Sequence, residues 1–293
     1  MGLASLAQYA LFLLVVAVLV KPVGGYLARV FSGEKTFLDP ALRPVEQLIY
    51  RLVRVDPQQE MDWKRYAVSF VCSGLDGTLL LYSILRLQYL LPWFFPSYHT
   101  TPLAPDLAMN TAVSFSTTTT WQAYAGESTM SYFSQMVGLA SQGFLAGASG
   151  LAVGMAFIRG LARDETNKLG NFWVDLVRAS LWVLLPISIV GSLLLIWQGV
   201  PMNFSRYVEA TTLEGSSQVI AQGPVAGLEL IKNLGTNGGG FFNVNGAHPY
   251  ANPTPLTNVL GMLAIVVLPA ALTNTFGRMI KRPRQGWLLF WVM

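Results

Sequence analysis

The sequence is poor in charged residues and in the residue types that bind metals or form disulfides. Charged residues make up 12% of its 293 residues, compared with roughly 25% in soluble domains, whereas hydrophobic residues make up 53%. With Cys72 as the single cysteine, a disulfide framework and a thiolate zinc site are excluded. The two histidines, His99 and His248, are far apart, and we expect both to be ordinary interfacial residues rather than metal ligands.

Two sequence signatures of ATP-hydrolysing proteins are also missing. The phosphate-binding loop Gly-x-x-x-x-Gly-Lys-[Ser/Thr] does not occur, and neither does the phosphorylation sequence Asp-Lys-Thr-Gly. The chain is therefore not expected to hydrolyse ATP itself by either route.

Long apolar runs recur along the chain, and each is long enough to cross a membrane. About 20 apolar residues in a helix span the hydrocarbon core of a bilayer. The first run follows no basic segment, so we interpret it as a retained helix rather than a signal peptide. The predicted spans are Leu3–Val20, Tyr66–Leu91, Ser131–Ile158, Phe172–Trp197 and Leu256–Phe276.

Lys and Arg are abundant in every second predicted loop and scarce in the loops between. Lys and Arg are abundant after the first, third and fifth spans, but none occurs from Leu87 to Ile158. The loop between Gln198 and Pro255 has only Arg206 and Lys232. Because Lys and Arg accumulate on the cytoplasmic side, the N-terminus is predicted to be extracytoplasmic. The formal charge of +4 thus reflects topology and does not indicate a nucleic-acid partner.

The first basic loop contains an amphipathic helix signal. Its apolar residues recur with helical spacing, while polar residues occupy the opposite face. Such a helix lies in the membrane interface or docks a partner subunit, and the sequence leaves both possibilities open. The apolar stripe consists of Val45, Leu48, Ile49, Leu52 and Val53.

Both predicted extracytoplasmic loops contain a short helix followed by a polar segment. In the first loop, a proline and an aspartate precede Leu107–Phe115, as at a helix start, and the polar segment Ser116–Gln122 follows. In the second loop, Val225–Leu234 is followed by Gly235–Gly240. Neither helix is long enough to span the bilayer. A re-entrant backbone is tolerated at membrane depth only where it lines a cavity, so two such loops suggest a pore entrance.

The polar segments suit a dehydrated monovalent cation. Selectivity filters replace the hydration shell of an ion with backbone carbonyl oxygens, and φ values accessible to glycine allow these carbonyls to align. Gly238, Gly239 and Gly240 permit this alignment, and Thr236 adds a hydroxyl oxygen. No carboxylate occurs in either segment, which argues against a divalent cation. Taken singly, each segment is also compatible with an ordinary turn, but their matching positions favour a filter.

These segments resemble the pore loops of the potassium-binding subunit of the Kdp-type potassium-transporting ATPase. The second loop is highly specific, and the similarity covers essentially all 293 residues. The residues that carry the resemblance are Gly235–Asn243, His248–Pro249, Asn252–Thr254, Thr111–Phe115, Trp121–Gln122, Gly126–Glu127, Ser131–Met136, Met61–Lys64, Leu169–Asn171 and Trp173–Leu176.

The resemblance implies an all-α polytopic membrane protein of the potassium-channel and Trk-like superfamily. Its pseudo-symmetric repeats would each contain a transmembrane helix, a re-entrant pore helix with a selectivity loop, and a second transmembrane helix. Such a protein selects K⁺ from the extracytoplasmic side of the bacterial inner membrane. It passes the ion to a P-type ATPase catalytic subunit, with which small accessory membrane subunits assemble.

By the family pattern, the K⁺ ligands come from both polar segments. The amide oxygen of Gln122 would supply a ligand where the first segment lacks a filter glycine. Asparagine is expected where this sequence has Thr118 and Thr120, so side-chain roles at those positions remain open. The residues implied are Thr117, Thr118, Thr119, Gln122, Thr236, Asn237, Gly238 and Gly239.

The resemblance also predicts how the chain is divided. The family subunit is about twice as long, so the third and fourth pore loops are expected to be missing, and this chain alone would not close a four-loop filter. The predicted parts are an extra transmembrane helix (1–30), a cytoplasmic basic segment with the amphipathic helix (31–65), a first pore repeat (66–160), a second (171–280) and the start of a third (286–293).

Two other functions remain open at this stage. One is a stand-alone cation channel or transporter of the Trk/Ktr type, which would need no ATPase partner. The other is a structural membrane subunit in which the glycine-rich segment is only a turn. Asp76, within the second span, is expected to be buried and hydrogen-bonded in a structural role rather than on the ion pathway.

Overall fold

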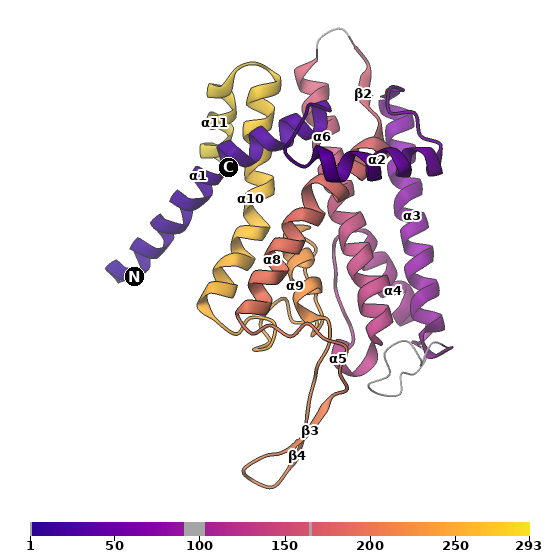
Figure 1. Cartoon of the computed structure of the whole chain (residues 1–293), viewed down its shortest axis with the longest axis vertical. Coiled ribbons are helices and arrows are strands. Elements are labelled where there is room, and N and C mark those ends of the chain that lie inside the picture. The colour runs from indigo at the N-terminus through magenta and orange to yellow at the C-terminus, as the bar shows by residue number, and fades with distance from the viewer. Residues whose placement is uncertain (1, 91–102, 164–165) are drawn as a thin grey trace. The chain divides into compact units, whose positions relative to one another are not determined.

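The computed structural model describes residues 2–90, 103–163 and 166–293 (Figure 1). His99 and the predicted end of the second span lie outside the described residues. The long helices are α1 (Leu3–Ser32), α2 (Asp39–Val53), α3 (Trp63–Leu87), α6 (Ser141–Ala162), α8 (Leu185–Trp197) and α10 (Pro255–Met279). The shorter helices are α4 (Pro105–Ser116), α5 (Gly126–Thr129), α7 (Phe172–Arg178), α9 (Val225–Leu234) and α11 (Pro283–Val292), with a 3₁₀ turn at Gln88–Leu90 and π-helical turns η2 (Ser134–Ala140) and η3 (Ala179–Leu184). Two antiparallel pairs are formed by β1 (Met61–Asp62) with β2 (Lys168–Gly170) and β3 (Val208–Thr211) with β4 (Ser217–Ile220).

Among the described residues, five helical stretches are long and apolar enough to cross a membrane. They correspond one by one to the spans predicted from hydropathy, with ends that differ by a few residues except in the first. The π-helical turns do not interrupt the third and fourth stretches. The five are Ser5–Ser32, Trp63–Leu90, Ser134–Ala162, Phe172–Trp197 and Pro255–Met279.

The first helix is longer than predicted. The apolar run ends at Val20, but α1 continues through Pro22 to Ser32. Its C-terminal part packs closely on α10: a Cβ on Gly24 would lie 2.6 Å from the carbonyl oxygen of Ala271. The hydroxyl of Thr275 donates to the carbonyl of Gly24 at 3.1 Å. These contacts with α10 stabilise a helical segment that hydropathy alone does not indicate.

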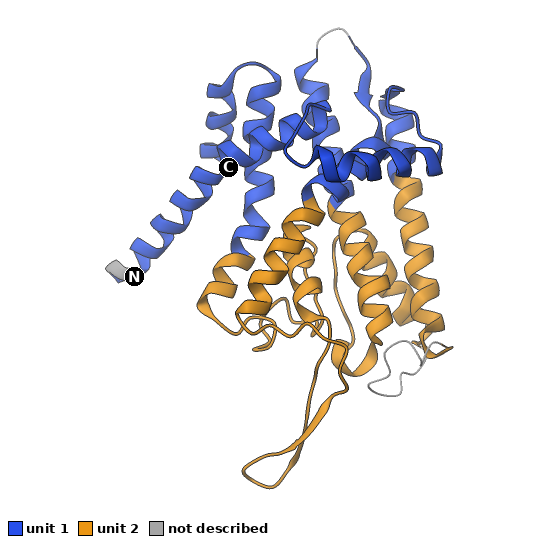
Figure 2. Cartoon of the chain, in the orientation of Figure 1, with its two compact units in different colours: residues 1–70, 148–183, 262–293 blue, residues 71–147, 184–261 orange. Residues whose placement is uncertain are grey.

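The chain forms two compact units, each assembled from segments that are distant in sequence (Figure 2). Unit 1 contains residues 1–70, 148–183 and 262–293, and unit 2 contains residues 71–147 and 184–261. The helices α3, α6 and α10 contribute to both units. The division into successive pore repeats stays a prediction.

Unit 1 is held together by a buried ion pair between α6 and α7. Arg159 donates to both carboxylate oxygens of Asp175, at 2.6 and 2.9 Å. The hydroxyl of Tyr66 donates to the same carboxylate at 3.0 Å. Arg159 also donates to the carbonyls of Leu169 and Phe31, at 3.1 and 3.3 Å. The side chains of the pair are only 6% and 1% exposed, so each charge depends on its partner and on these hydrogen bonds.

The predicted amphipathic helix is confirmed as α2; on the side away from its apolar stripe, Glu46 and Tyr50 point inward, whereas Gln47 and Arg51 are exposed. Glu46 and Tyr50 are its buried residues; Tyr50 donates to Glu46 at 2.7 Å, and Arg178 of α7 donates to Glu46 at 3.0 Å. The apolar stripe is left on the surface, as binding to a membrane interface or a partner subunit would require. Its exposed residues are Val45, Leu48, Leu52 and Val53.

Both predicted short helices are confirmed in unit 2. The helix α4 has Pro105 in its first turn and Asp106 beside it, which suits a helix N-terminus. The helix α9 packs against α8 and η2, and a Cβ on Gly191 would lie 2.3 Å from Leu230. The largely buried face of α9 shows that it is an internal element of unit 2.

Two features of unit 2 differ from the sequence-based interpretation. The hairpin of β3 and β4 was not predicted; its turn contains Gly215, and its tip residue Leu213 is fully exposed (Figure 1). Asp76 was expected to be buried, and this prediction was wrong, because its side chain is exposed on α3. Asp76 lies on the uncovered face of α3, and the sequence pattern did not show which face of this helix is covered.

Candidate functional site

The two polar segments follow their helices with the same backbone turn. The amides of Thr117, Thr118 and Thr120 donate to the carbonyls of Val113, Phe115 and Ser114, at 3.0, 3.5 and 3.0 Å. The amides of Gly235, Thr236 and Gly238 donate to the carbonyls of Ile231, Asn233 and Lys232, at 2.8, 3.1 and 3.4 Å. Every donor and acceptor in the second set lies 118 residues after its equivalent in the first. The two loops are therefore structural copies, although their residues differ.

The copies also share left-handed backbone positions. Thr118 and Thr120 have φ values of 59° and 51°, and the equivalent Thr236 and Gly238 have 55° and 81°. Gly239 and Gly240 continue the left-handed run at 76° and 108°, as the sequence predicts for a glycine-rich filter segment. The left-handed threonines were not predicted, because β-branched residues rarely adopt this conformation. The backbone of the first loop thus adopts the same left-handed conformations as the second loop at these two positions, although it has no glycine there.

A prediction about stability follows for Thr118. Replacing it with asparagine, which tolerates φ near 59°, is expected to raise the free energy of unfolding by about 1 kcal/mol. The midpoint temperature of thermal unfolding in detergent should then rise by roughly 2 °C. Thr119→Asn is the matched control, because Thr119 is not among the left-handed residues. Equal shifts for both variants would contradict a strained Thr118.

The two loops contact each other within unit 2. The hydroxyl of Thr120 donates to the carbonyl of Asn237. The side-chain amide of Gln122 donates to the carbonyl of Gly240 at 3.2 Å and to the hydroxyl of Tyr124 at 2.7 Å. Burial raises the pKa of Tyr124, which keeps this phenol neutral. Of the sequence-predicted site residues, Gln122, Asn237 and Gly239 thus lie where the two segments meet, since a Cβ on Gly239 would lie 2.4 Å from Gln122 Oε1.

The amide oxygens of two predicted ligands have no protein partner among the described residues. Gln122 Oε1 and Asn237 Oδ1 are both buried and accept no hydrogen bond. Their orientation is set by the amide nitrogens, since Gln122 donates to Gly240 and Asn237 Nδ2 donates to the carbonyl of Gly143 at 2.8 Å. A buried acceptor without a partner reduces the stability of the fold, because its desolvation is not compensated by a hydrogen bond. Both oxygens suit a cation that needs neutral oxygen ligands.

The hydroxyls of the other predicted ligands bind nearby backbone. Thr117 donates to the carbonyl of Val113 at 2.9 Å and shares a 3.0 Å hydrogen bond with Thr119. Thr118 and Thr236 each donate to the carbonyl of the preceding residue, at 2.6 and 2.8 Å. These four threonines are exposed, whereas Asn237 and Gly239 are buried. Each of these hydroxyl oxygens keeps a lone pair with which it can coordinate a cation.

Several residues that shape this site were missed by sequence reasoning. Asn245 accepts from the amide of Gly239 with its side chain and donates to the carbonyl of Gly239 with its own amide at 3.1 Å. Gln135 donates to the carbonyls of Gly126 and Phe241, both at 3.3 Å. A Cβ on Gly126 would lie 1.9 Å from the carbonyl oxygen of Phe241, so only glycine fits there. The amide-rich stretch after Gly240 was the one available signal for Asn245.

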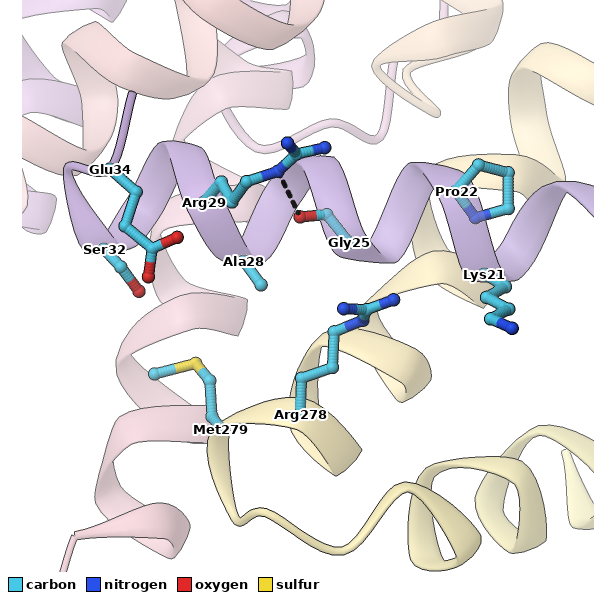
Figure 3. Close-up of a pocket in the computed structure, with 9 residues that line it drawn as sticks. All are labelled: Lys21, Pro22, Gly25, Ala28, Arg29, Ser32, Glu34, Arg278 and Met279. Carbon is cyan, nitrogen blue, oxygen red and sulfur yellow. Dashed lines mark hydrogen bonds between the residues drawn. The ribbon is translucent and has the colours of Figure 1, made fainter. Parts of the chain in front are cut away.

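A cavity of about 640 Å³ in unit 1 has the opposite electrostatic character (Figure 3). Its lining includes Lys21 and Arg29 from α1 and Arg278 from α10, with the carboxylate of Glu34 at one end. A Cβ on Gly25 would lie 3.0 Å from Arg278 Nη2, so the guanidinium closely approaches α1. The lining thus carries three cations and one carboxylate, and this excess of positive charge disfavours K⁺.

Comparison with known proteins identifies the family. The family model for the potassium-transporting ATPase A subunit matches residues 10–293. The chain is 55% identical over 293 residues to the potassium-transporting ATPase potassium-binding subunit of Methylorubrum extorquens, covering 100% of this chain and 51% of the relative. The corresponding protein of Rhodopseudomonas palustris is 54% identical over 286 residues, covering 98% and 50%. The chain thus spans about half the length of the curated relatives it matches. It belongs to the potassium-transporting ATPase A subunit family.

Proposed function

We propose that the chain binds and selects K⁺ from the extracytoplasmic side of the membrane and delivers it to a P-type ATPase subunit. The observation that carries the proposal is the pair of matching loops in unit 2, together with the buried amide oxygens of Gln122 and Asn237, which have no hydrogen-bond partner among the described residues. The names of the relatives support K⁺ as the ion and an ATPase as the partner.

The chemistry of the loops favours K⁺ over a divalent ion. K⁺ is coordinated by neutral carbonyl and amide oxygens, whereas Ca²⁺ and Mg²⁺ favour carboxylates, which neither polar segment contains. The ion is transported cargo rather than a resident cofactor. The proposed ligands are the oxygens of Thr117, Thr118, Thr119, Gln122, Thr236, Asn237, Gly238 and Gly239.

The proposed setting is the bacterial inner membrane, with the N-terminus and both loops extracytoplasmic. The positive-inside rule supports this orientation, because the loops with few Lys and Arg are those that contain α4 and α9. In this setting, residues 66–160 and 171–280 form two pore repeats. The hydrolytic subunit and small accessory membrane subunits are separate partners, and the chain itself does not hydrolyse ATP.

The test is to purify the chain from native membranes with the proteins that remain bound and to measure ATP hydrolysis in K⁺ and in Na⁺. The proposal predicts at least about tenfold stimulation by K⁺ relative to Na⁺, equivalent to about 1.4 kcal/mol of discrimination. K⁺ binding without a copurifying ATPase would instead indicate a Trk/Ktr-like channel or transporter. Absence of both activities would indicate a structural subunit and would overturn the proposal.

A further inference from the structure

A buried ion pair lies on α9 and is not used in the proposed coordination of K⁺. Lys232 Nζ donates to Glu229 Oε2 at 2.5 Å, and the two residues are 3% and 4% exposed. The other carboxylate oxygen of Glu229 accepts from Asn233 Nδ2 at 3.3 Å. Lysine and glutamate are almost never this deeply buried without a partner. The pair therefore occupies a site that excludes water.

The pair lies directly behind the glycine segment. A Cβ on Gly240 would lie 3.0 Å from Lys232 Cδ, 3.1 Å from its Nζ and 3.4 Å from Glu229 Oε2. A Cβ on Gly246 would lie 3.0 Å from Glu229 Oε1 and 3.4 Å from Lys232 Nζ. The two charged groups thus fill the space that side chains at these glycines would need. The backbone of the segment rests against the pair.

The backbone of Lys232 is connected to the same segment. Its carbonyl accepts from the amides of Asn237 and Gly238, at 2.9 and 3.4 Å. In the first loop, the residue equivalent to Lys232 is Ser114, whose hydroxyl accepts from the amide of Trp121 at 2.6 Å. Both residues thus bind the segment that follows the helix: Lys232 through its carbonyl, and Ser114 through its carbonyl and its hydroxyl.

Stability alone does not account for this arrangement. Burying two charges costs desolvation energy, and apolar residues of similar size usually stabilise a protein at least as well. An unpaired Lys232 would repel a cation bound nearby, and an unpaired Glu229 would attract cations of any kind. Together, the two side chains carry no net charge and lie against Gly240.

We propose that Glu229 and Lys232 are positioning residues that support the Gly238–Gly240 backbone and so determine discrimination between K⁺ and Na⁺. The inference rests on the proposed function, because it assumes that this segment contacts the ion. The pair acts through the backbone and does not touch the ion. Its net neutrality leaves the backbone and amide oxygens as the groups that attract the ion.

The test compares ion competition in Glu229→Gln, Lys232→Met and the double variant E229Q/K232M, each in the complete native assembly. The measured quantity is the ratio of K⁺ to Na⁺ affinities, determined beside the midpoint of thermal unfolding. Both single variants are expected to lose at least about tenfold in this ratio. The double variant, which leaves no unpaired buried charge, is expected to regain thermal stability but not discrimination.

The less buried intrahelical pair Arg43–Asp39 on α2, 2.9 Å apart with side chains 50% and 17% exposed, provides the matched control. The double variant D39N/R43Q should leave the affinity ratio unchanged. A folded E229Q/K232M protein with the original ratio would overturn the inference while leaving the proposed function intact. Failure of the unsubstituted protein to bind K⁺ would instead overturn the proposed function itself.

Discussion

Replacing Gly239 with alanine is expected to weaken K⁺ binding by at least about tenfold while the protein remains folded. A Cβ at this position would lie 2.4 Å from Gln122 Oε1 and 3.0 Å from Gln122 Cδ. The amide oxygen must then move, although it is a proposed ligand of the ion and is held in place through the hydrogen bond from Gln122 to Gly240. Equilibrium competition between K⁺ and Na⁺ in the purified assembly measures the effect.

The control for this substitution is Gly215→Ala in the β3–β4 hairpin. Gly215 has a φ of 83°, close to the 76° of Gly239, but no atom lies within 4 Å of its would-be Cβ. The two variants therefore share the strain of a left-handed alanine and differ in the contact with Gln122. K⁺ affinity should fall in Gly239→Ala only. An equal loss in both variants would show that backbone strain, rather than displacement of Gln122, causes the effect.

Replacing Asp175 with asparagine is expected to reduce the free energy of unfolding by about 3–5 kcal/mol, because Arg159 is left with an uncompensated charge inside unit 1. The guanidinium would keep its bonds to the carbonyls of Leu169 and Phe31 but lose both charged contacts with Asp175. Denaturant titration in mixed micelles measures the change. The double variant Arg159→Met/Asp175→Leu should be less destabilised than Asp175→Asn alone.

The exposed pair Arg163–Glu60 is the control for the buried pair. Its atoms are 2.8 Å apart, but its side chains are 34% and 40% exposed. Glu60→Gln should therefore cost at most about 1 kcal/mol. If Asp175→Asn costs no more than Glu60→Gln, the buried pair does not hold unit 1 together.

The helical framework could be predicted because its signals are local. Runs of apolar residues identify the spans, and the proline and aspartate before Leu107 identify the start of α4. The second short helix, Val225–Leu234, was predicted with the bounds that the structure shows. The glycine run after it correctly indicated left-handed backbone at Gly238, Gly239 and Gly240.

Features that depend on tertiary contacts could not be predicted in the same way. The extension of α1 to Ser32 depends on its packing against α10, and the exposure of Asp76 depends on which face of α3 is covered. The left-handed threonines are set by the turn that closes each loop, which overrides the preference of a β-branched residue. The burial of Glu229 beside Lys232 likewise becomes apparent only when the glycine segment folds back on α9.

The repeated turn has a consequence for the ancestry of the molecule. From Ser114 to Thr120 and from Lys232 to Gly238, the one identical pair is Thr118 with Thr236, yet the backbone bonds coincide. Duplication of one ancestral helix and loop would produce this combination of shared backbone geometry and different sequences. The ancestry is then recorded in the path of the main chain, and a search for further copies in longer relatives should look for that path rather than for a motif.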